Sequence, residues 1–143
     1  MNKGKIAVFA TVAAVIAVAA IWTRGGETPP SAVANAGQAA AVSVAVPASF
    51  SDEAKIGERA FNAICAACHG VNAAGTDVGP PLVHEIYEPS HHGDYAFESA
   101  VTNGVRAHHW QFGNMSPQPA LTKADLRSVI AYVRELQREN GIQ

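Results

Sequence analysis

A Cys-x-x-Cys-His motif at residues 65–69 constrains this chain more than any other feature of its sequence. Two cysteines at this spacing, followed at once by a histidine, form the pattern through which haem is attached covalently to protein. The spacing suits that chemistry, because the thiols of Cys65 and Cys68 can each add to one vinyl group of a porphyrin while His69 lies under the iron. We therefore expect one haem c bound through Cys65 and Cys68, with His69 as the proximal iron ligand.

The same cysteine spacing has two other uses. A thioredoxin-like redox pair belongs in a βαβ context, whereas the residues around Cys65 favour a helix and a glycine-rich loop. A structural zinc site usually takes four ligands, and because the chain has only two cysteines, zinc would have to use histidines as well. Both uses remain alternatives, although the surrounding sequence favours haem.

The N-terminus predicts export from the cytoplasm. Residues 6–22 are apolar except for Thr11 and follow two lysines, Lys3 and Lys5. As a helix this run would span roughly 25 Å at about 1.5 Å per residue, which is near the lower limit for crossing a bilayer. We therefore expect residues 1–23 to form an uncleaved signal anchor, a transmembrane helix in the cytoplasmic membrane of a bacterium.

A cleaved signal peptide is the alternative for this segment. Its apolar core is normally shorter and is closely followed by a cleavage site of small residues, whereas Trp22, Thr23 and Arg24 follow the run here. Both interpretations leave the lysines in the cytoplasm and place the rest of the chain in the periplasm, where bacterial haem attachment takes place. Cleavage would make the protein soluble in the periplasm.

The remaining chain divides into a linker and one small domain. Residues 24–50 are rich in Ala, Gly, Pro, Ser and Val and nearly uncharged, which predicts a flexible linker; a loosely packed strand around residues 41–46 is the alternative. Residues 51–143 suffice for one domain with a limited core of its own. They carry seven basic and eleven acidic side chains, a formal charge of −4. Without a basic stripe, a nucleic-acid partner is not expected.

The first predicted helix of the domain runs from Ser51 or Asp52 to about Ile64. The hydroxyl of Ser51 can cap it, and the acidic residues that follow suit its positive first turn. Apolar side chains then recur at helical spacing. The expected buried stripe consists of Ile56, Ala60, Phe61 and Ile64.

Two further helices are expected downstream. One covers residues 94–102 and ends at an Asn-Gly pair; its partly inward residues would be Tyr95, Phe97 and Val101. The other begins at Thr122, which can form a capping box with Asp125, and runs to about Gln137. Its expected core residues are Leu126, Val129, Ile130, Val133 and Leu136. No alternating strand pattern occurs in the domain, so an all-α fold is expected.

In these features the sequence resembles the class I c-type cytochromes, over about residues 52–138. That family has a Gly-x-x-x-aromatic pattern before its haem motif, and Gly57 and Phe61 stand in those places. Tyr132 is similar to the aromatic residue of the family's C-terminal helix. The resemblance implies a single-haem bacterial cytochrome, membrane-anchored or exported. Its all-α domain would have N- and C-terminal helices crossing around a covalently bound haem, preceded here by an N-terminal membrane helix.

The resemblance also implies the remaining haem contacts. Apart from Met1, the only methionine is Met115, in a glycine- and proline-punctuated stretch, residues 112–117, that resembles the family's methionine loop. Met115 is therefore the implied distal iron ligand. The Gly-Pro-Pro-Leu stretch at residues 79–82 resembles the loop whose proline carbonyl accepts a hydrogen bond from the proximal histidine, a role that falls to Pro80. Such a bond fixes the imidazole and raises its basicity.

Further histidines leave alternatives on the distal side: His84, His91, His92, His108 and His109. Any of them could replace Met115 and give a bis-histidine haem of lower potential, since Met/His ligation raises it; His108 and His109 are the closest rivals. The two His-His pairs could also bind a copper or zinc ion at the surface. Trp110 and Arg106 are expected to wall the haem, with Arg106 as a candidate partner for a propionate.

Together these features predict electron transfer by a single haem. If His69 and Met115 both bind the iron, no coordination position is open, so an electron carrier rather than an enzyme is expected. Its partners would be a redox donor and a redox acceptor, and the mildly acidic surface would attract one with a basic patch. The alternatives are a haem sensor or ligand-binding module, with bis-His ligation or an open site where Met115 dissociates, and a small subunit of a membrane oxidoreductase.

Overall fold

The structure is a computed structural model that describes residues 40–143, and the predicted anchor at 1–23 lies outside them. The helices are α2 (Asp52–Ile64), α3 (Ala66–His69), η2 (Val71–Ala73), η3 (Glu85–Tyr87), α4 (Asp94–Asn103) and α5 (Lys123–Glu139). Within this part of the chain there is no strand, only an isolated antiparallel bridge between Val105 and Met115, which confirms the all-α prediction. No helix in residues 40–143 is long and apolar enough to cross a bilayer.

Local capping explains where the two longest helices begin. The hydroxyl of Ser51 accepts a hydrogen bond from the amide of Ala54 at the start of α2, as its sequence predicts. At the start of α5, Thr122 accepts from the amide of Asp125, and the Asp125 carboxylate accepts from the amide of Thr122. This reciprocal pair satisfies two backbone donors that would otherwise lack partners. Both predicted N-termini are confirmed.

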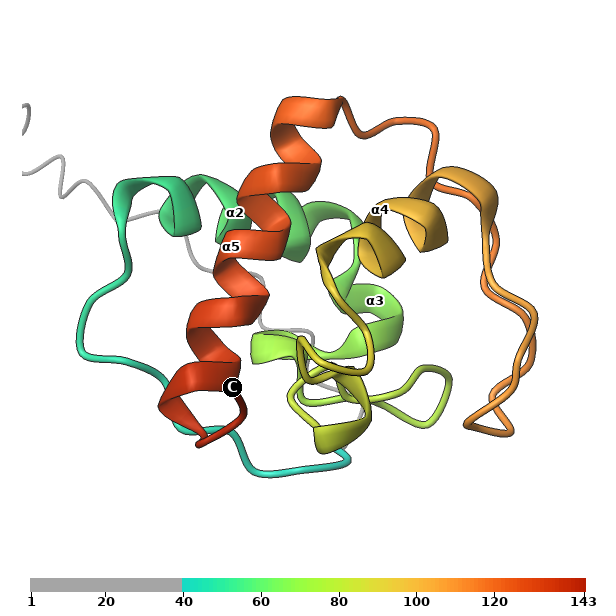
Figure 1. Cartoon of the computed structure of the whole chain (residues 1–143), viewed down its shortest axis with the longest axis horizontal. Coiled ribbons are helices and arrows are strands. Elements are labelled where there is room, and N and C mark those ends of the chain that lie inside the picture. Colours follow the sequence, from blue (N-terminus) through green and yellow to red (C-terminus); the bar gives the residue numbers. More distant parts are fainter. Residues whose placement is uncertain (1–39) are drawn as a thin grey trace, which may run out of the picture. The chain divides into compact units, whose positions relative to one another are not determined.

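α2 and α5 cross in close contact, and Gly57 makes the approach possible (Figure 1). A Cβ atom on Gly57 would overlap the carbonyl of Ser128 and lie 2.9 Å from the amide nitrogen of Val129. Aromatic rings fill the crossing, with the ring centre of Tyr132 5.5 Å from that of Phe61 and 5.1 Å from that of Phe50. Phe61 and Tyr132 are completely buried, so the predicted glycine and aromatic pair is the centre of the core.

Two side chains of the predicted stripes face solvent instead. Ile56 is 47 % exposed and Tyr95 is 79 % exposed. Each lies two positions from a residue on its helix's inward side, Ala54 in α2 and Phe97 in α4, and two positions turn a helix by about 200°. The buried face of α2 consists of Ala54, Gly57 and Phe61, because the small Ala54 and Gly57 let α5 approach this face. All five apolar residues predicted for the core of α5 are buried.

Residues 40–50, the last part of the predicted linker, lie against the domain. The amide of Val42 donates to the carbonyl of Ala74 at 3.0 Å, and the backbone of Ala45 exchanges two hydrogen bonds with the side chain of Asn140. Val44 and Phe50 pack on the core. No strand forms at residues 41–46. The flexible linker expected for residues 24–50 therefore does not extend to residue 50.

A buried polar pair on α5 holds the segment between η2 and α4. Arg134 is only 7 % exposed, and its guanidinium donates to the Asp94 carboxylate at 2.8 Å and to the carbonyls of Tyr87 at 2.7 Å and His92 at 2.6 Å. The fully buried Gln137 donates to the carbonyls of Leu82 and Tyr87. The two side chains thereby satisfy backbone carbonyls in a stretch that has no long helix of its own.

Candidate functional site

The Cys-x-x-Cys-His motif lies where α2 gives way to α3. Cys65 is the C-cap residue that directly follows α2, and its amide donates to the carbonyl of Phe61 at 2.7 Å. The amide of His69 donates to the carbonyl of Cys65 at 2.9 Å, so the motif closes into one compact turn. Gly70, with φ of 74°, ends that turn. The buried Phe61 thus fixes the position from which the motif projects.

The imidazole of His69 is held by the predicted loop. Its Nδ1 lies 2.9 Å from the carbonyl oxygen of Pro80. A carbonyl only accepts hydrogen bonds, so Nδ1 carries the proton and Nε2 keeps its lone pair. Burial lowers the pKa of His69, an effect that the bond to Pro80 opposes. The neutral tautomer with a free Nε2 is the form that binds a metal.

Thr76 and Gly79 place Pro80, and neither residue was among the predicted site residues. The Thr76 hydroxyl donates to the carbonyl of Cys68 at 2.5 Å and accepts from the amide of Val78 at 3.1 Å. A Cβ on Gly79 would lie 2.5 Å from the carbonyl oxygen of Cys68, so only glycine admits the loop this close. A Thr-x-x-Gly-Pro sequence shortly after the motif is the signal by which the role of Thr76 could have been predicted.

The two cysteines are free thiols and differ in exposure. Cys65 is half-buried and Cys68 is exposed. Burial, with a smaller effect from Cys68, raises the pKa of the Cys65 thiol to about 11. A reactive redox or nucleophilic cysteine needs a lowered pKa. This environment therefore argues against a thioredoxin-like role for Cys65.

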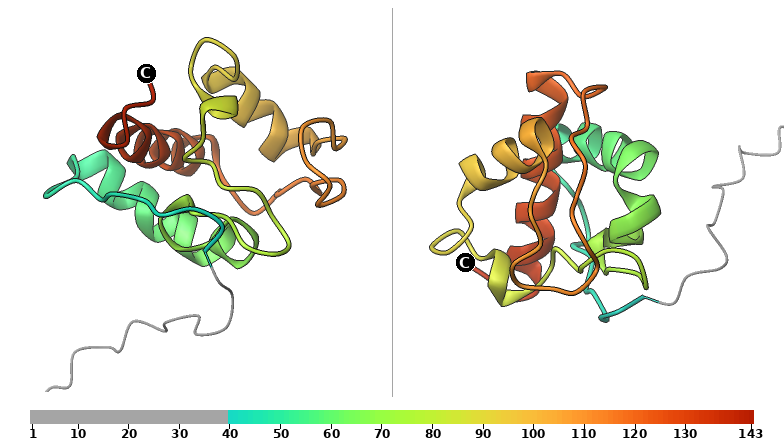
Figure 2. Two further views of the ribbon diagram at one scale, coloured as in Figure 1. Left: turned by 90° about the horizontal axis from the view of Figure 1, so that it is seen from below. Right: turned by 90° about the vertical axis from the view of Figure 1, so that its right-hand side faces the viewer.

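Met115 lies on an arm formed by residues 104–117. The arm doubles back on itself, because Val105 and Met115 exchange backbone hydrogen bonds of 2.9 and 3.0 Å, and the Asn114 side chain accepts from the amide of Ala107 at 3.0 Å. A Cβ on Gly104 would lie 2.5 Å from the Met115 carbonyl oxygen. Figures 1 and 2 show this arm, in orange, across from the green segment that holds α3. Met115 is half-buried, whereas its neighbours on the arm from Gln111 to Pro117 are exposed.

The other histidines lie in two groups. The ring of His84 packs edge-on against Trp110 at 5.0 Å, and its Nδ1 accepts from the amide of Ile86. The remaining four gather in one cluster, in which the ring centres of neighbouring members lie 4.3–6.0 Å apart. Its members are His91, His92, His108 and His109. The two rivals to Met115 therefore contact other histidines, and both are exposed.

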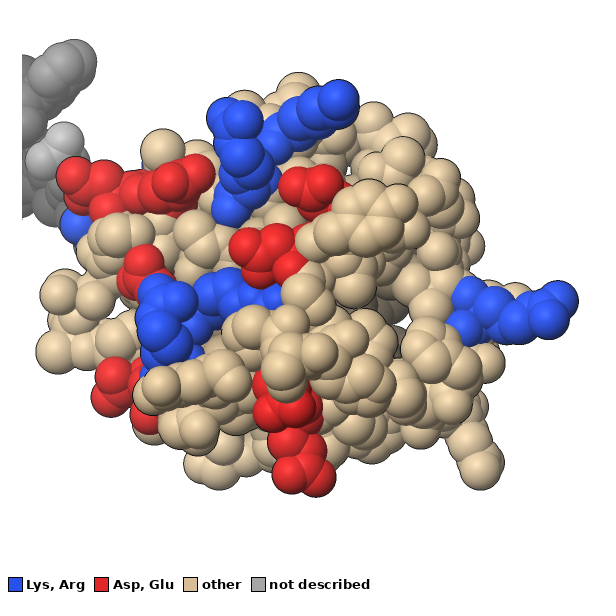
Figure 3. All heavy atoms as spheres, in the orientation of Figure 1, with Lys and Arg blue, Asp and Glu red and all other residues tan. Residues whose placement is uncertain are grey.

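Further observations test whether these residues fit a haem. The indole nitrogen of Trp110 is buried and makes no hydrogen bond of good geometry within residues 40–143, although it lies close enough to the Tyr87 hydroxyl to oppose the rise in the pKa of that group. Its N–H can therefore be offered to an added acceptor such as a propionate. The space-filling view shows a hollow right of centre, on the face that the arm borders (Figure 3). With the thiols and the free Nε2 of His69, these features fit a haem. Arg106, the other predicted wall residue, is exposed.

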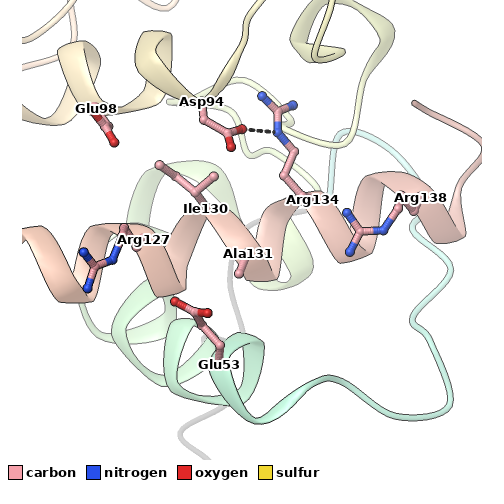
Figure 4. A pocket seen from close by; sticks show the side chains of 8 residues that line it. All are labelled: Glu53, Asp94, Glu98, Arg127, Ile130, Ala131, Arg134 and Arg138. Carbon is pink, nitrogen blue, oxygen red and sulfur yellow. Dashed lines mark hydrogen bonds and ion pairs between the residues drawn. The ribbon is translucent and has the colours of Figure 1, made fainter.

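A second hollow lies elsewhere and has different chemistry. It measures about 420 Å³ and is formed by side chains of α2, α4 and α5 (Figure 4). Acidic side chains, among them Glu53 and Glu98, face basic ones such as Arg127, and the Arg134–Asp94 ion pair forms part of its wall. No predicted haem residue lines it. We therefore treat this hollow as a charged surface groove separate from the haem site.

Comparison with known proteins agrees with the geometry. The family model described as Cytochrome c matches residues 54–137, which span the motif, the Pro80 loop, the arm and most of α5. No curated protein matched, and neither did any solved structure.

Proposed function

As the chain belongs to the cytochrome c family, we propose that it is a single-haem electron carrier whose iron is held by His69 and Met115. Members of the family are generally electron carriers with covalently attached haem c, and Cys65 and Cys68 fit that attachment. When bound, haem c supplies a one-electron couple between ferrous and ferric iron. The observation that carries the proposal is the 2.9 Å contact between Nδ1 of His69 and the carbonyl of Pro80.

On the proximal side the chain fixes the orientation of one imidazole. The bond to Pro80 holds the His69 ring and makes its Nε2 a stronger donor. Thr76 and Gly79 keep that carbonyl in place through their contacts with the backbone of Cys68. If a haem iron were bound, these contacts would keep the His69 ring in one orientation.

On the distal side, Met115 is the sulfur donor that the domain offers. Its backbone is paired with that of Val105, and the amide of Gln118, which directly follows the arm, donates to the carbonyl of Val101 at 2.8 Å. The side of the arm that carries Met115 is therefore held to α4. His108 and His109 are exposed and engaged in the histidine cluster. This placement favours Met115 over either histidine as the sixth ligand.

The surface around the site suits contact with redox proteins. Val71, Val78 and Phe112 are large apolar side chains with 55, 49 and 38 % exposure, and they lie next to the motif, in the Pro80 loop and on the arm. In Figure 3 acidic and basic side chains mix over the helices, while the surface near the arm is mostly uncharged. Exposed apolar side chains mark interaction sites where they form a continuous patch. We propose that donor and acceptor dock there.

We further propose that residues 1–23 anchor the protein in the cytoplasmic membrane with the haem domain in the periplasm. The support is the sequence of residues 6–22, apolar after two lysines. Membrane fractionation of the intact chain tests it. Recovery of the protein in the membrane fraction after a high-salt wash is expected, whereas recovery of the haem protein only in the soluble periplasm would refute the anchor.

Potentiometric titration of the full-length holoprotein tests the carrier function. We expect a single reversible one-electron couple, with both oxidation states low-spin and slow to bind carbon monoxide or cyanide. Met115→Ala should lower the potential and open the site to both ligands. A wild-type protein that is high-spin or binds these ligands rapidly would favour a sensor or ligand-binding module. Loss of the low-spin state in His108→Asn/His109→Asn, with Met115→Ala behaving as the wild type does, would favour bis-histidine ligation.

A further inference from the structure

The histidine cluster joins two segments that are distant in sequence. His91 and His92 lie in the turn before α4, while His108 and His109 lie near the bend where the arm doubles back. Ring centres are 4.6 Å apart for His91 and His92, and 5.1 Å separates His109 from each of them. Each of these three rings offers a nitrogen, and the three nitrogens lie within 4.8 Å of one another.

We propose that His91, His92 and His109 form a second metal site, which binds one late first-row transition ion, preferentially Cu²⁺. Imidazole is a ligand of choice for copper and zinc, and affinity for divalent ions in a site of this kind peaks at Cu²⁺. No thiolate or carboxylate belongs to the group, so nothing in it selects a softer or a harder ion.

One of the three proposed ligands, His92, has the support that metal ligands usually have. Its Nδ1 lies 2.7 Å from the carbonyl oxygen of Ile86. A metal-binding histidine almost always donates its other ring N–H to such an oxygen, which fixes the ring and the tautomer. Nε2 of His92 is therefore left free to bind. The buried Arg134 holds the carbonyl of His92 from the other side.

Space also agrees with a cation in this position. Two nitrogens on one ion lie at most about 4.2 Å apart, because each metal–nitrogen distance is about 2.1 Å. The cluster must therefore close slightly. His91 and His109 are exposed, so their rings can turn toward one ion without displacing a core residue.

A bound ion would tie the arm to the turn before α4. The arm carries Met115, and its two sides are joined by the Val105–Met115 bridge and by Asn114. Crosslinking His109 to His91 and His92 would hold the arm against a segment that α5 already anchors through Arg134. The metal would thus restrict opening of the arm without touching the proposed iron ligands.

Calorimetric titration of the ferric full-length holoprotein, purified without a histidine tag, tests the site. Cu²⁺ buffered with glycine is titrated in one experiment, Zn²⁺ in a second and Mg²⁺ in a third. We expect one Cu²⁺ per chain with nitrogen coupling in its electron paramagnetic resonance spectrum, weaker binding of Zn²⁺ at the same site, and no binding of Mg²⁺. His91→Asn and His109→Asn should each weaken Cu²⁺ binding by about tenfold or more.

His84→Asn is the matched control, because His84 lies outside the cluster and asparagine can also cap a helix. This variant should bind Cu²⁺ as the wild type does. Equal Cu²⁺ affinity in the wild type and His109→Asn would overturn the proposal, and so would an equal loss in His84→Asn. Tighter binding of Zn²⁺ than of Cu²⁺ would contradict the preference for copper.

Discussion

Gly57→Ala should destabilise the domain by roughly 2–3 kcal/mol, although alanine is the better helix former. A Cβ at this position would overlap the carbonyl of Ser128, and because both partners are helix backbone, α2 and α5 must separate by roughly 1 Å. Phe61 and Tyr132 are completely buried at the crossing, and burial of each contributes about 3 kcal/mol.

The net effect follows from how much of that contact survives. A gap of about 0.5–1 Å forfeits a quarter to a half of the contact energy, which is roughly 1.5–3 kcal/mol for the two rings. Neighbouring core residues raise the loss above about 3 kcal/mol. The higher helix propensity of alanine offsets about 1 kcal/mol of this loss. The net loss of roughly 2–3 kcal/mol in the free energy of unfolding corresponds to a fall in Tm of roughly 10–20 °C for a domain of this size.

Thermal and urea denaturation of the holoprotein, followed by far-ultraviolet circular dichroism, measures this loss. Gly93→Ala is the control, because Gly93 has φ of −60° and its added Cβ would meet its nearest atom, the Pro89 carbonyl oxygen, at 3.4 Å. The control should lose less than about 1 kcal/mol. If Gly57→Ala were as stable as Gly93→Ala, the close backbone crossing would not be a determinant of this fold.

Three other substitutions test the polar contacts, each by urea denaturation of the holoprotein. Arg134→Met removes a guanidinium that holds several groups and should cost about 3 kcal/mol, while the exposed Arg138→Met should change stability by less than about 0.5 kcal/mol; equal effects would contradict the anchoring role. Thr76→Val leaves two backbone partners unsatisfied and should cost about 2 kcal/mol, against no measurable change for the exposed Thr102→Val. Hydrogen bonds from Thr122 lower the pKa of Asp125 below 3.8, so its carboxylate stabilises the fold above that pH and loses this effect as the pH falls through the lowered pKa. The stability difference between wild type and Asp125→Asn should therefore shrink below about pH 4, and a difference that grew there would refute the sign.

The sequence predicts the features whose causes are local. Ser51 and Thr122 predict the starts of α2 and α5, because each N-cap side chain accepts a hydrogen bond from an amide within the first turn of its own helix. The haem motif and the Gly57–Phe61 spacing are likewise short patterns. The Pro80 contact was predictable only through resemblance, since Pro80 is eleven positions from His69 and the bond depends on how the loop between them folds.

Features that depend on distant partners were not predictable in this way. Arg134 and Gln137 belong to the face of α5 that charge alone would assign to solvent, yet both are buried because backbone carbonyls 42–55 positions away meet them. Tyr95 was expected to face inward, but α4 turns Phe97 toward the core and leaves Tyr95 outside. The two His-His pairs are recognisable in the sequence, whereas their union in one cluster requires the arm.

The ferric absorption spectrum of the full-length holoprotein in the far red tests the central claim most directly. A methionine sulfur on ferric haem iron gives a weak charge-transfer band in that region. His69 and Met115 ligation predicts this band in the wild type and in His108→Asn/His109→Asn, and its loss in Met115→Ala. A low-spin wild-type spectrum without the band, or a band that persists in Met115→Ala, would contradict Met115 as the iron ligand.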